Sequence, residues 1–182
     1  ICSGDSVILN ITLNGQGPFT STITDGNNSN TYNLGLNGLQ TNGQVVSFTP
    51  TTTTTYAITS LSDQTACVNL NPISATVNVV QPPNAGIGGS VSACTNDSII
   101  DLTTYLSGAD TNGIWTDPLN NVISNIFDPN TQNSGNFTYT VSASPCPDDN
   151  AIINVIVNTP PTGIANANPA TICIGDQTTL IG

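Results

Sequence analysis

The sequence lacks most of the side chains on which catalysis depends. It contains no Lys, Arg, His or Met, and all eleven of its acidic residues are Asp. General acid–base catalysis draws on His first, and then on Glu, Asp, Lys, Tyr and Cys. Without His, neither a Ser–His–Asp nor a Cys–His arrangement can form, and zinc sites of the Cys and His type are excluded as well. The composition therefore predicts that the chain is not an enzyme and holds no metal or cofactor.

The absence of cations also limits the partners of the chain. Its formal net charge is −11, and charged residues make up only 6% of the sequence. Binding to nucleic acid depends on Lys and Arg that neutralise phosphates, and anionic membranes attract proteins through the same residues. No run of about 18 apolar residues is present, which is the minimum for a membrane-spanning helix. We therefore expect no nucleic-acid partner and no membrane insertion.

What the sequence does contain is a series of short segments typical of β-strands. No apolar pattern of helical period extends beyond one turn, whereas β-branched runs alternate with clusters of Gly, Pro and Asn. Such spacing is typical of β-sandwiches. The predicted strands are 7–13, 19–25, 32–36, 45–49, 53–61, 73–80, 98–102, 113–117, 136–144 and 151–157, with turns at 15–18, 25–28, 37–38 and 42–43. The sequence thus predicts an all-β fold.

The five cysteines mark a repeat. Cys2, Cys94 and Cys173 each open the phrase Cys-x-(Gly or Asn)-Asp, which is followed by a strand-like run, whereas Cys67 and Cys146 come later. Three copies of one phrase at wide spacing indicate a tandem array of modules. The sequence has no CxxC pair, which would have suggested metal or redox chemistry. We therefore interpret the cysteines as structural.

The simplest disulfide pairing keeps each bridge inside one module. It joins Cys2 to Cys67 and Cys94 to Cys146, and leaves Cys173 for a partner further along the chain. Four cysteines allow three connectivities, so the other two remain open. Disulfides persist in oxidising compartments, which predicts an extracellular location.

Proline pairs separate the predicted modules. Pro82-Pro83 and Pro160-Pro161 favour extended, semi-rigid connections. The predicted domains are residues 1–81, residues 84–158 and the truncated start of a third module at 162–182. The chain has no initiator Met and no basic, apolar signal peptide, so we expect it to be an internal part of a longer precursor.

Several motifs in their order resemble a known family. They include Asn84-Ala85-Gly86, Trp115 and its neighbours, Phe127-Asp128-Pro129 and the segment 135–141 in the second module, and Gly17-Pro18-Phe19 with the Thr-rich run 50–56 in the first. These motifs resemble the Ig-like and PKD-like repeats of giant cell-surface proteins of Bacteroidetes-type bacteria. The resemblance implies tandem Ig-like β-sandwich modules in a protein exported by the type IX pathway and used in gliding, adhesion or fibre formation.

Some residues are candidates for specific roles. Ser6 and Ser98 lie in Asp-Ser-apolar sequences, which the resemblance implies as O-glycosylation sites, although a turn capped by the Asp is the alternative. Trp115 and Tyr139 could form a ligand-stacking surface, but a lone Trp on a sandwich strand more commonly packs in the core. Asp148-Asp149 offers oxygen ligands for Ca²⁺, but a solvated loop is the simpler interpretation.

These observations predict a structural repeat segment of an extracellular surface fibre, stalk or adhesin. Its partners would be neighbouring modules or further copies of the protein in a fibre, and possible targets would be a surface glycan or the substratum. The alternative is an adhesion module that binds a carbohydrate or a host protein, and a third hypothesis is a spacer for an enzyme elsewhere in the precursor. The binding alternative needs an exposed aromatic platform, for which the chain has one Trp and four Tyr.

Overall fold

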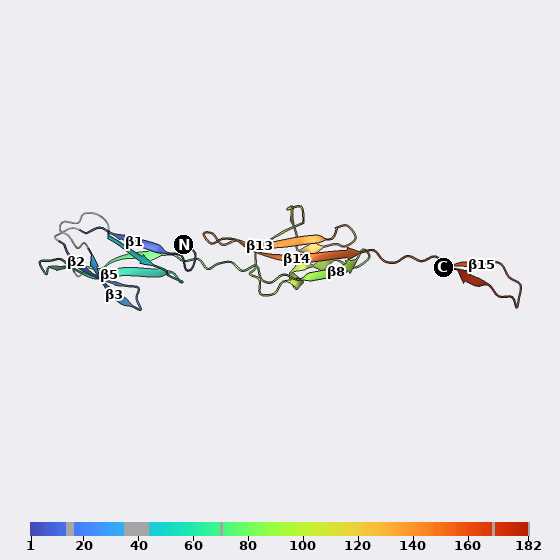
Figure 1. Ribbon diagram of the computed structural model, residues 1–182, viewed down its shortest axis with the longest axis horizontal. Coiled ribbons are helices and arrows are strands. Elements are labelled where there is room, and N and C mark those ends of the chain that lie inside the picture. Colours follow the sequence, from blue (N-terminus) through green and yellow to red (C-terminus); the bar gives the residue numbers. More distant parts are fainter. Residues whose placement is uncertain (14–16, 35–43, 70, 169, 182) are drawn as a thin grey trace. The chain divides into compact units, whose positions relative to one another are not determined.

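The computed structural model (Figure 1) describes residues 1–13, 17–34, 44–69, 71–168 and 170–181. Over these residues the chain forms β-strands and one short 3₁₀-helix, and no α-helix. The predicted all-β class is therefore confirmed. The turns predicted at 37–38 and 42–43, half of the turn at 15–18 and the last two residues of the strand at 32–36 lie outside the described residues.

The described chain divides into two compact units. The first comprises residues 1–85, 108–113 and 140–150, and the second comprises residues 86–107, 114–139 and 151–182. The division into modules at 1–81, 84–158 and 162–182, and the role of the proline pairs as linkers, stay predictions.

The first strands of the chain form two sheets. One sheet pairs β1 (Val7–Ile11) antiparallel with β4 (Gln44–Phe48). The other sheet is built on β5 (Thr54–Ser62), which pairs with β2, β6 and β7, while β2 also pairs with β3. The bounds of these four strands are Phe19–Thr24 (β2), Ser29–Leu34 (β3), Val68–Asn69 (β6) and Ile73–Val77 (β7).

Alternation along the strands places one face of each sheet in a shared core. On β2, Phe19, Ser21 and Ile23 are buried, whereas Thr20 is exposed. The core cluster takes side chains from both sheets: Ile11, Leu13, Phe19, Ile23, Leu34, Val46 and Tyr56. Phe48 of β4 stacks on Tyr56 of β5 with ring centroids 4.3 Å apart. Two sheets packed face to face around this core make a β-sandwich.

A second pair of sheets repeats the pattern. The larger sheet has the order β11-β10-β13-β14-β8, and the smaller one pairs β9 with β12. The strands are β8 (Ser90–Cys94), β9 (Ile100–Asp101), β10 (Ile114–Thr116), β11 (Val122–Ile123), β12 (Ile126–Phe127), β13 (Gly135–Val141) and β14 (Asp149–Asn158), with the 3₁₀-helix η1 at Leu102–Tyr105. Phe127 of β12 meets Phe137 of β13 edge to face, with ring centroids 5.1 Å apart. Because these rings come from the two different sheets, this part of the chain is also a sandwich.

The two sandwiches have the same strand order. In the first, β3, β2, β5 and β7 lie side by side, and in the second, β11, β10, β13 and β14 do so. The first strand pair β1–β4 corresponds to β9–β12. Each sandwich therefore has a long central strand, β5 or β13, followed in the chain by a strand that pairs with it, β7 or β14. This repetition gives each cysteine a position that can be compared between the two sandwiches.

One strand of the second sandwich differs from the prediction. The sequence predicts its first strand at 98–102, but the strand ends at Cys94 and begins at Ser90, while only Ile100–Asp101 is extended in the later segment. β8 runs parallel to β14, with Val91 opposite Val155 and Cys94 opposite Asn158. Its pattern is weak in the sequence because Gly88-Gly89 precedes it and it has only five residues.

The final described segment contains a short hairpin. β15 (Asn166–Asn168) pairs antiparallel with β16 (Thr179–Ile181). All six of these residues are exposed.

Candidate functional sites

The opening phrase of each repeat folds into the same turn. The backbone N–H of Cys2 donates to Oδ2 of Asp5 at 3.0 Å, and the N–H of Asp5 donates back to the Cys2 carbonyl at 3.0 Å. Cys94 and Asp97 make the same two bonds, at 2.7 and 2.9 Å. So do Cys173 and Asp176, at 3.2 and 3.0 Å.

The Asp of this phrase is therefore a turn-forming residue. Its side chain accepts a hydrogen bond from the amide of the cysteine three residues earlier. Asp side chains commonly stabilise turns in this way, in competition with regular secondary structure. The sequence could show the recurring phrase, but the reciprocal bonding appears only in the structure.

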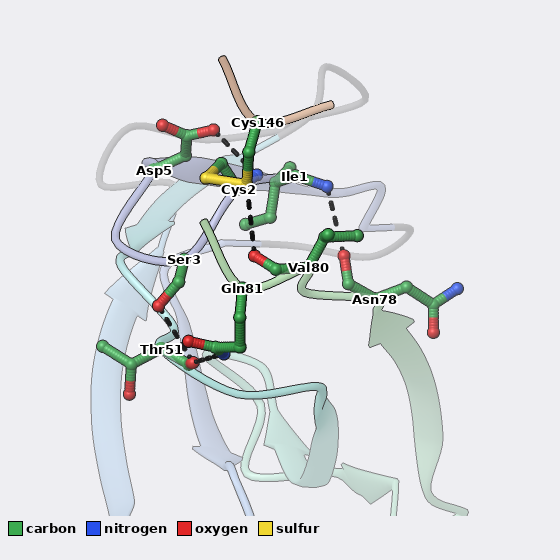
Figure 2. Close-up of a disulfide and its surroundings, with 9 residues drawn as sticks. All are labelled: Ile1, Cys2, Ser3, Asp5, Thr51, Asn78, Val80, Gln81 and Cys146. Carbon is green, nitrogen blue, oxygen red and sulfur yellow. Dashed lines mark hydrogen bonds between the residues drawn. A yellow bond between two sulfur atoms is a disulfide. The ribbon is translucent and has the colours of Figure 1, made fainter. Parts of the chain in front are cut away.

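A disulfide joins Cys2 to Cys146 within the first unit (Figure 2). Their Cα atoms are 4.8 Å apart, and both residues are buried, at 7% and 5% exposure. Cys2 forms a parallel bridge with Val80, and the carbonyl oxygen of Val80 lies 3.4 Å from Sγ of Cys146. Because 144 positions separate the two cysteines, closing the loop stabilises the folded chain by about 5 kcal/mol in the chain-entropy model.

The predicted pairing of Cys2 with Cys67 is wrong, because the two residues lie at opposite ends of β5. Cys2 lies at the start of that strand, where Gly4 and Ser3 donate to the carbonyls of Pro50 and Thr51. Cys67 follows the strand's other end and is exposed with a free thiol. Nine residues at about 3.3 Å each separate them by roughly 30 Å, whereas a disulfide needs Cα atoms within about 7 Å.

The predicted pairing of Cys94 with Cys146 fails for the same reason. Cys94 lies opposite Asn158, the last residue of β14, whereas Cys146 precedes the first residue of that strand. The ten residues of β14 separate the two sulfurs by about 30 Å. Cys94 is half-buried, and its thiol, like that of Cys173, is free.

Trp115 and Tyr139 do not form a surface platform. Trp115 is 4% exposed and Tyr139 is 6% exposed, and their ring centroids lie 5.0 Å apart in the core. Tyr56 on β5 is equally buried and holds the position that Tyr139 holds on β13. The structural interpretation of these aromatic residues is thus correct, and the ligand-stacking interpretation is wrong.

Ser6 and Ser98 are both exposed, and each follows directly after the Asp of an opening turn. The turn that was the alternative to glycosylation is present at both sites. Because the turn uses the Asp carboxylate and the cysteine amide, it leaves the following hydroxyl available to solvent. O-glycosylation of these residues stays a prediction.

Several other carboxylates accept hydrogen bonds from nearby backbone amides, hydroxyl groups or Asn side chains. Asp25 accepts the N–H groups of Asn27 and Asn28, which hold its pKa below the ordinary value. At Asp63 and Asp101 the pKa is lowered chiefly by the hydroxyl of a Thr two residues later, and at Asp117 by the side chain and then the backbone of Asn121.

Asp149 has a similar role, because its Oδ2 accepts the N–H of Ala85 at 2.8 Å. Asp148 beside it is exposed. Within the described ranges, no group of three or more His, Cys, Asp or Glu residues could hold a metal ion. The structure thus shows a structural task for Asp149 and no cation site around this pair among the residues it describes.

No helix in the described part of the chain has both the length and the apolar character needed to cross a membrane.

Comparisons with known proteins give little further information. No protein-family model and no curated protein matches the chain. Among solved structures, the chain aligns with Sidekick-1 immunoglobulin domains 1-5 at 9% identity and a TM-score of 0.34. The alignment covers 92% of this chain and 37% of that one, so the chain spans little more than a third of that structure. The β-sandwich fold follows from the strand order and the core packing of the chain itself.

Proposed function

We propose that the chain is a structural repeat segment of an extracellular surface fibre, stalk or adhesin, and that it has no catalytic activity. The observation that carries this proposal is the repetition of one strand order together with three copies of the Cys–Asp turn. Sandwiches that recur along one chain are suited to extending a surface structure by addition of similar units.

Two further observations support an external and non-catalytic role. The buried cystine is stable in an oxidising compartment and would be reduced in most cytosols. The carboxylates with shifted pKa values each serve a local turn or cap, and their pKa values are lowered. A general acid needs the opposite shift, toward neutral pH.

The proposal extends to origin, partners and modification. A giant surface protein of Bacteroidetes-type bacteria, exported by the type IX pathway, is the source that the motifs favour. Its partners would be adjacent repeats and other copies in a fibre. Glycans on Ser6 and Ser98 would add a hydrated layer at the two exposed turns, on a surface that has few charged groups.

Immunogold labelling of intact cells tests this proposal. An antibody against the chain should label extended structures outside the envelope before permeabilisation. Labelling only after permeabilisation would contradict the proposed location, and a discrete hydrolytic activity of the purified chain would contradict the non-catalytic role.

Mass spectrometry of protein purified from the producing cells tests the glycans. We expect added hexose-type mass on peptides that contain Ser6 and Ser98, and none on the third opening, where Gln177 replaces Ser. Ser6→Ala and Ser98→Ala should each remove one glycan. Unmodified peptides at both positions would refute the modification and leave the structural role untouched.

The alternative, an adhesion module that binds a carbohydrate or a host protein, loses its aromatic platform because Trp115 and Tyr139 are buried. A surface depression of about 350 Å³ lined by Asp117, Leu119, Gln132 and Phe137 is one place where a ligand could lie. Binding on a glycan array that is lost in Gln132→Ala, with unchanged folding, would favour this alternative over a purely structural role.

A further inference from the structure

We propose that Cys67 and Cys94 each form a cystine of the same kind as Cys2–Cys146. In this kind of bond an opening cysteine, which begins the Cys–Asp turn of one repeat, is joined to a loop cysteine, which follows the central strand of the next repeat. Cys94 would then bond to a loop cysteine of a third repeat, and Cys67 would bond to an opening cysteine of a preceding one. This inference rests on the repeat organisation and goes beyond the proposed function.

Cys2 and Cys94 have the same surroundings. Each begins a turn in which its N–H is accepted by the Asp three residues later. Each is paired in parallel with the end of the closing segment of its sandwich, Cys2 with Val80 and Cys94 with Asn158.

The next residue repeats the match. The N–H of Ser3 donates to the Val80 carbonyl, and the N–H of Thr95 donates to the Asn158 carbonyl, both at 2.9 Å. Two residues with the same bonds at the same place in the same strand order are equivalent. Cys94 is therefore an opening cysteine of the kind that is bonded at Cys2.

Cys67 and Cys146 are equivalent in a different position. Cys67 lies in the loop that follows β5, and Cys146 lies in the loop that follows β13. These two strands hold the same place in their sheets, and each buries a Tyr, at positions 56 and 139. Cys67 is therefore a loop cysteine of the kind that is bonded at Cys146.

The observed bond combines one cysteine of each kind. It joins the opening cysteine that precedes the first sandwich to the loop cysteine of the second sandwich. A bond within one sandwich is prevented, because the length of β5 separates Cys2 from Cys67 and the length of β14 separates Cys94 from Cys146. Before Cys173, the free cysteines are one loop cysteine, Cys67, and one opening cysteine, Cys94, which are the two kinds that the bond requires. Cys173, which has the same turn, is a further opening cysteine.

The chemistry is an ordinary thiol oxidation. Two thiols lose two protons and two electrons as the S–S bond forms, and an external disulfide accepts the electrons and becomes two thiols. In a cell the oxidant would be a protein disulfide of the thiol–disulfide exchange class, and in a test tube it would be oxidised glutathione. The exposed Cys67 thiol and the half-buried Cys94 thiol are accessible enough for this exchange.

The inference can be tested with a tandem protein in which residues 1–171 precede a complete copy of the chain. This junction keeps the natural spacing, because Ile172-Cys173 aligns with Ile1-Cys2. After oxidation with glutathione, the protein is digested without reduction. Trypsin is unsuitable because the chain has no Lys or Arg, so chymotrypsin is combined with a protease that cleaves before Asp. Chymotrypsin cleaves after Leu70, between Cys67 and Cys94, and the second protease cleaves before Asp148 and Asp149, between Cys146 and the Cys2 of the next copy.

We expect a peptide that links Cys94 of the first copy to Cys67 of the second, together with the Cys2–Cys146 peptide from each copy. Cys94→Ser in the first copy should abolish only the first link and leave Cys67 of the second copy open to alkylation. As a matched control, Cys2→Ser in the first copy should remove only one Cys2–Cys146 peptide. Circular dichroism establishes that each variant has folded.

Two results would overturn the inference. One is a Cys94 thiol that remains free in the first copy of the oxidised tandem, and the other is a bond between Cys67 and Cys94 of the same copy. Neither result bears on where the protein is located, so the proposed surface role would stand or fall separately by the labelling experiment.

Discussion

At the scale of single residues, the Asp carboxylates stabilise local turns through hydrogen bonds and not through ion pairs. The chain has no Lys, Arg or His, so no side-chain ion pair can form. Backbone amides, Thr hydroxyls and Asn side-chain amides are the donors that face Asp25, Asp63 and Asp101. An Asp in this chain therefore stabilises a local turn, and its charge is compensated by N–H and O–H dipoles.

Asp101 gives a direct test of this role. Its Oδ1 accepts the Thr103 N–H at 2.9 Å and the Asn125 amide at 2.8 Å, at the start of η1. Asp101→Ala should lower the free energy of unfolding by about 1 kcal/mol, the usual effect of losing a cap. Urea denaturation measures it. The matched Asp148→Ala changes an exposed loop residue and should leave the midpoint unchanged, and equal losses in both variants would contradict the capping role.

The same carboxylates predict how stability depends on pH. The pKa values of Asp25, Asp63, Asp101 and Asp117 are lowered in the folded chain. A lowered pKa contributes stability that is present above the unfolded value of about 3.9 and is lost as the pH falls through the folded value.

We therefore expect the melting temperature to hold between pH 5 and 7, since the chain has no His to titrate there, and to fall below pH 4. Thermal unfolding followed by circular dichroism at pH 3, 4.5 and 6 measures this dependence. Protonation also relieves the repulsion within a chain of net charge −11, which acts in the opposite direction. A melting temperature that rises from pH 4.5 to pH 3 would mean that repulsion outweighs the turn contacts.

At the scale of elements, strands with strict alternation could be predicted from the sequence. Ala151, Ile153 and Val155 are buried on one face of β14, whereas Ile152 and Ile156 are exposed on the other. The same pattern placed β2, β5 and β13 within one to three residues of their observed bounds. Period-two burial is a local property, so a local pattern suffices to predict it.

β8 and the disulfide could not be predicted in this way, because both depend on distant partners. β8 is held by parallel pairing with β14, about 60 residues further along the chain. The cystine depends on which strand ends lie together, and the sequence pattern does not show that the lengths of β5 and β14 separate cysteines of the same repeat.

A glycine shows how closely β8 approaches its neighbour. An ideal Cβ on Gly88 would overlap the backbone carbonyl of Ile152 in β14. Gly88→Ala should therefore destabilise the second sandwich by roughly 1–3 kcal/mol, as expected when a methyl group is forced into a packed position. Chemical denaturation followed by Trp115 fluorescence reports on this sandwich, because Trp115 is buried in it.

Gly163→Ala is the matched control, since no atom lies within 4 Å of a Cβ built there. It should be neutral. If Gly88→Ala were neutral as well, the close approach of Gly88 to the backbone of β14 would be refuted.

At the scale of the whole molecule, the position of the cystine determines how the chain responds to pulling. All residues between Cys2 and Cys146 lie inside one covalent loop. A force applied to the two ends passes through the S–S bond and bypasses that loop. The proposed surface stalk would benefit from this under shear, because unfolding inside the loop would not lengthen it.

Single-molecule stretching makes this prediction quantitative. When the oxidised chain is pulled from its two ends, only residues 147–182 contribute appreciable length, which is about 130 Å when fully extended. The Cys146→Ser variant, or the reduced chain, should extend to about 650 Å, the span of all 182 residues. An oxidised chain that lengthens as far as the variant would show that Cys2 and Cys146 are not bonded. A stalk keeps its reach only if its length is fixed under load. That result would therefore also mean that the chain lacks this mechanical protection.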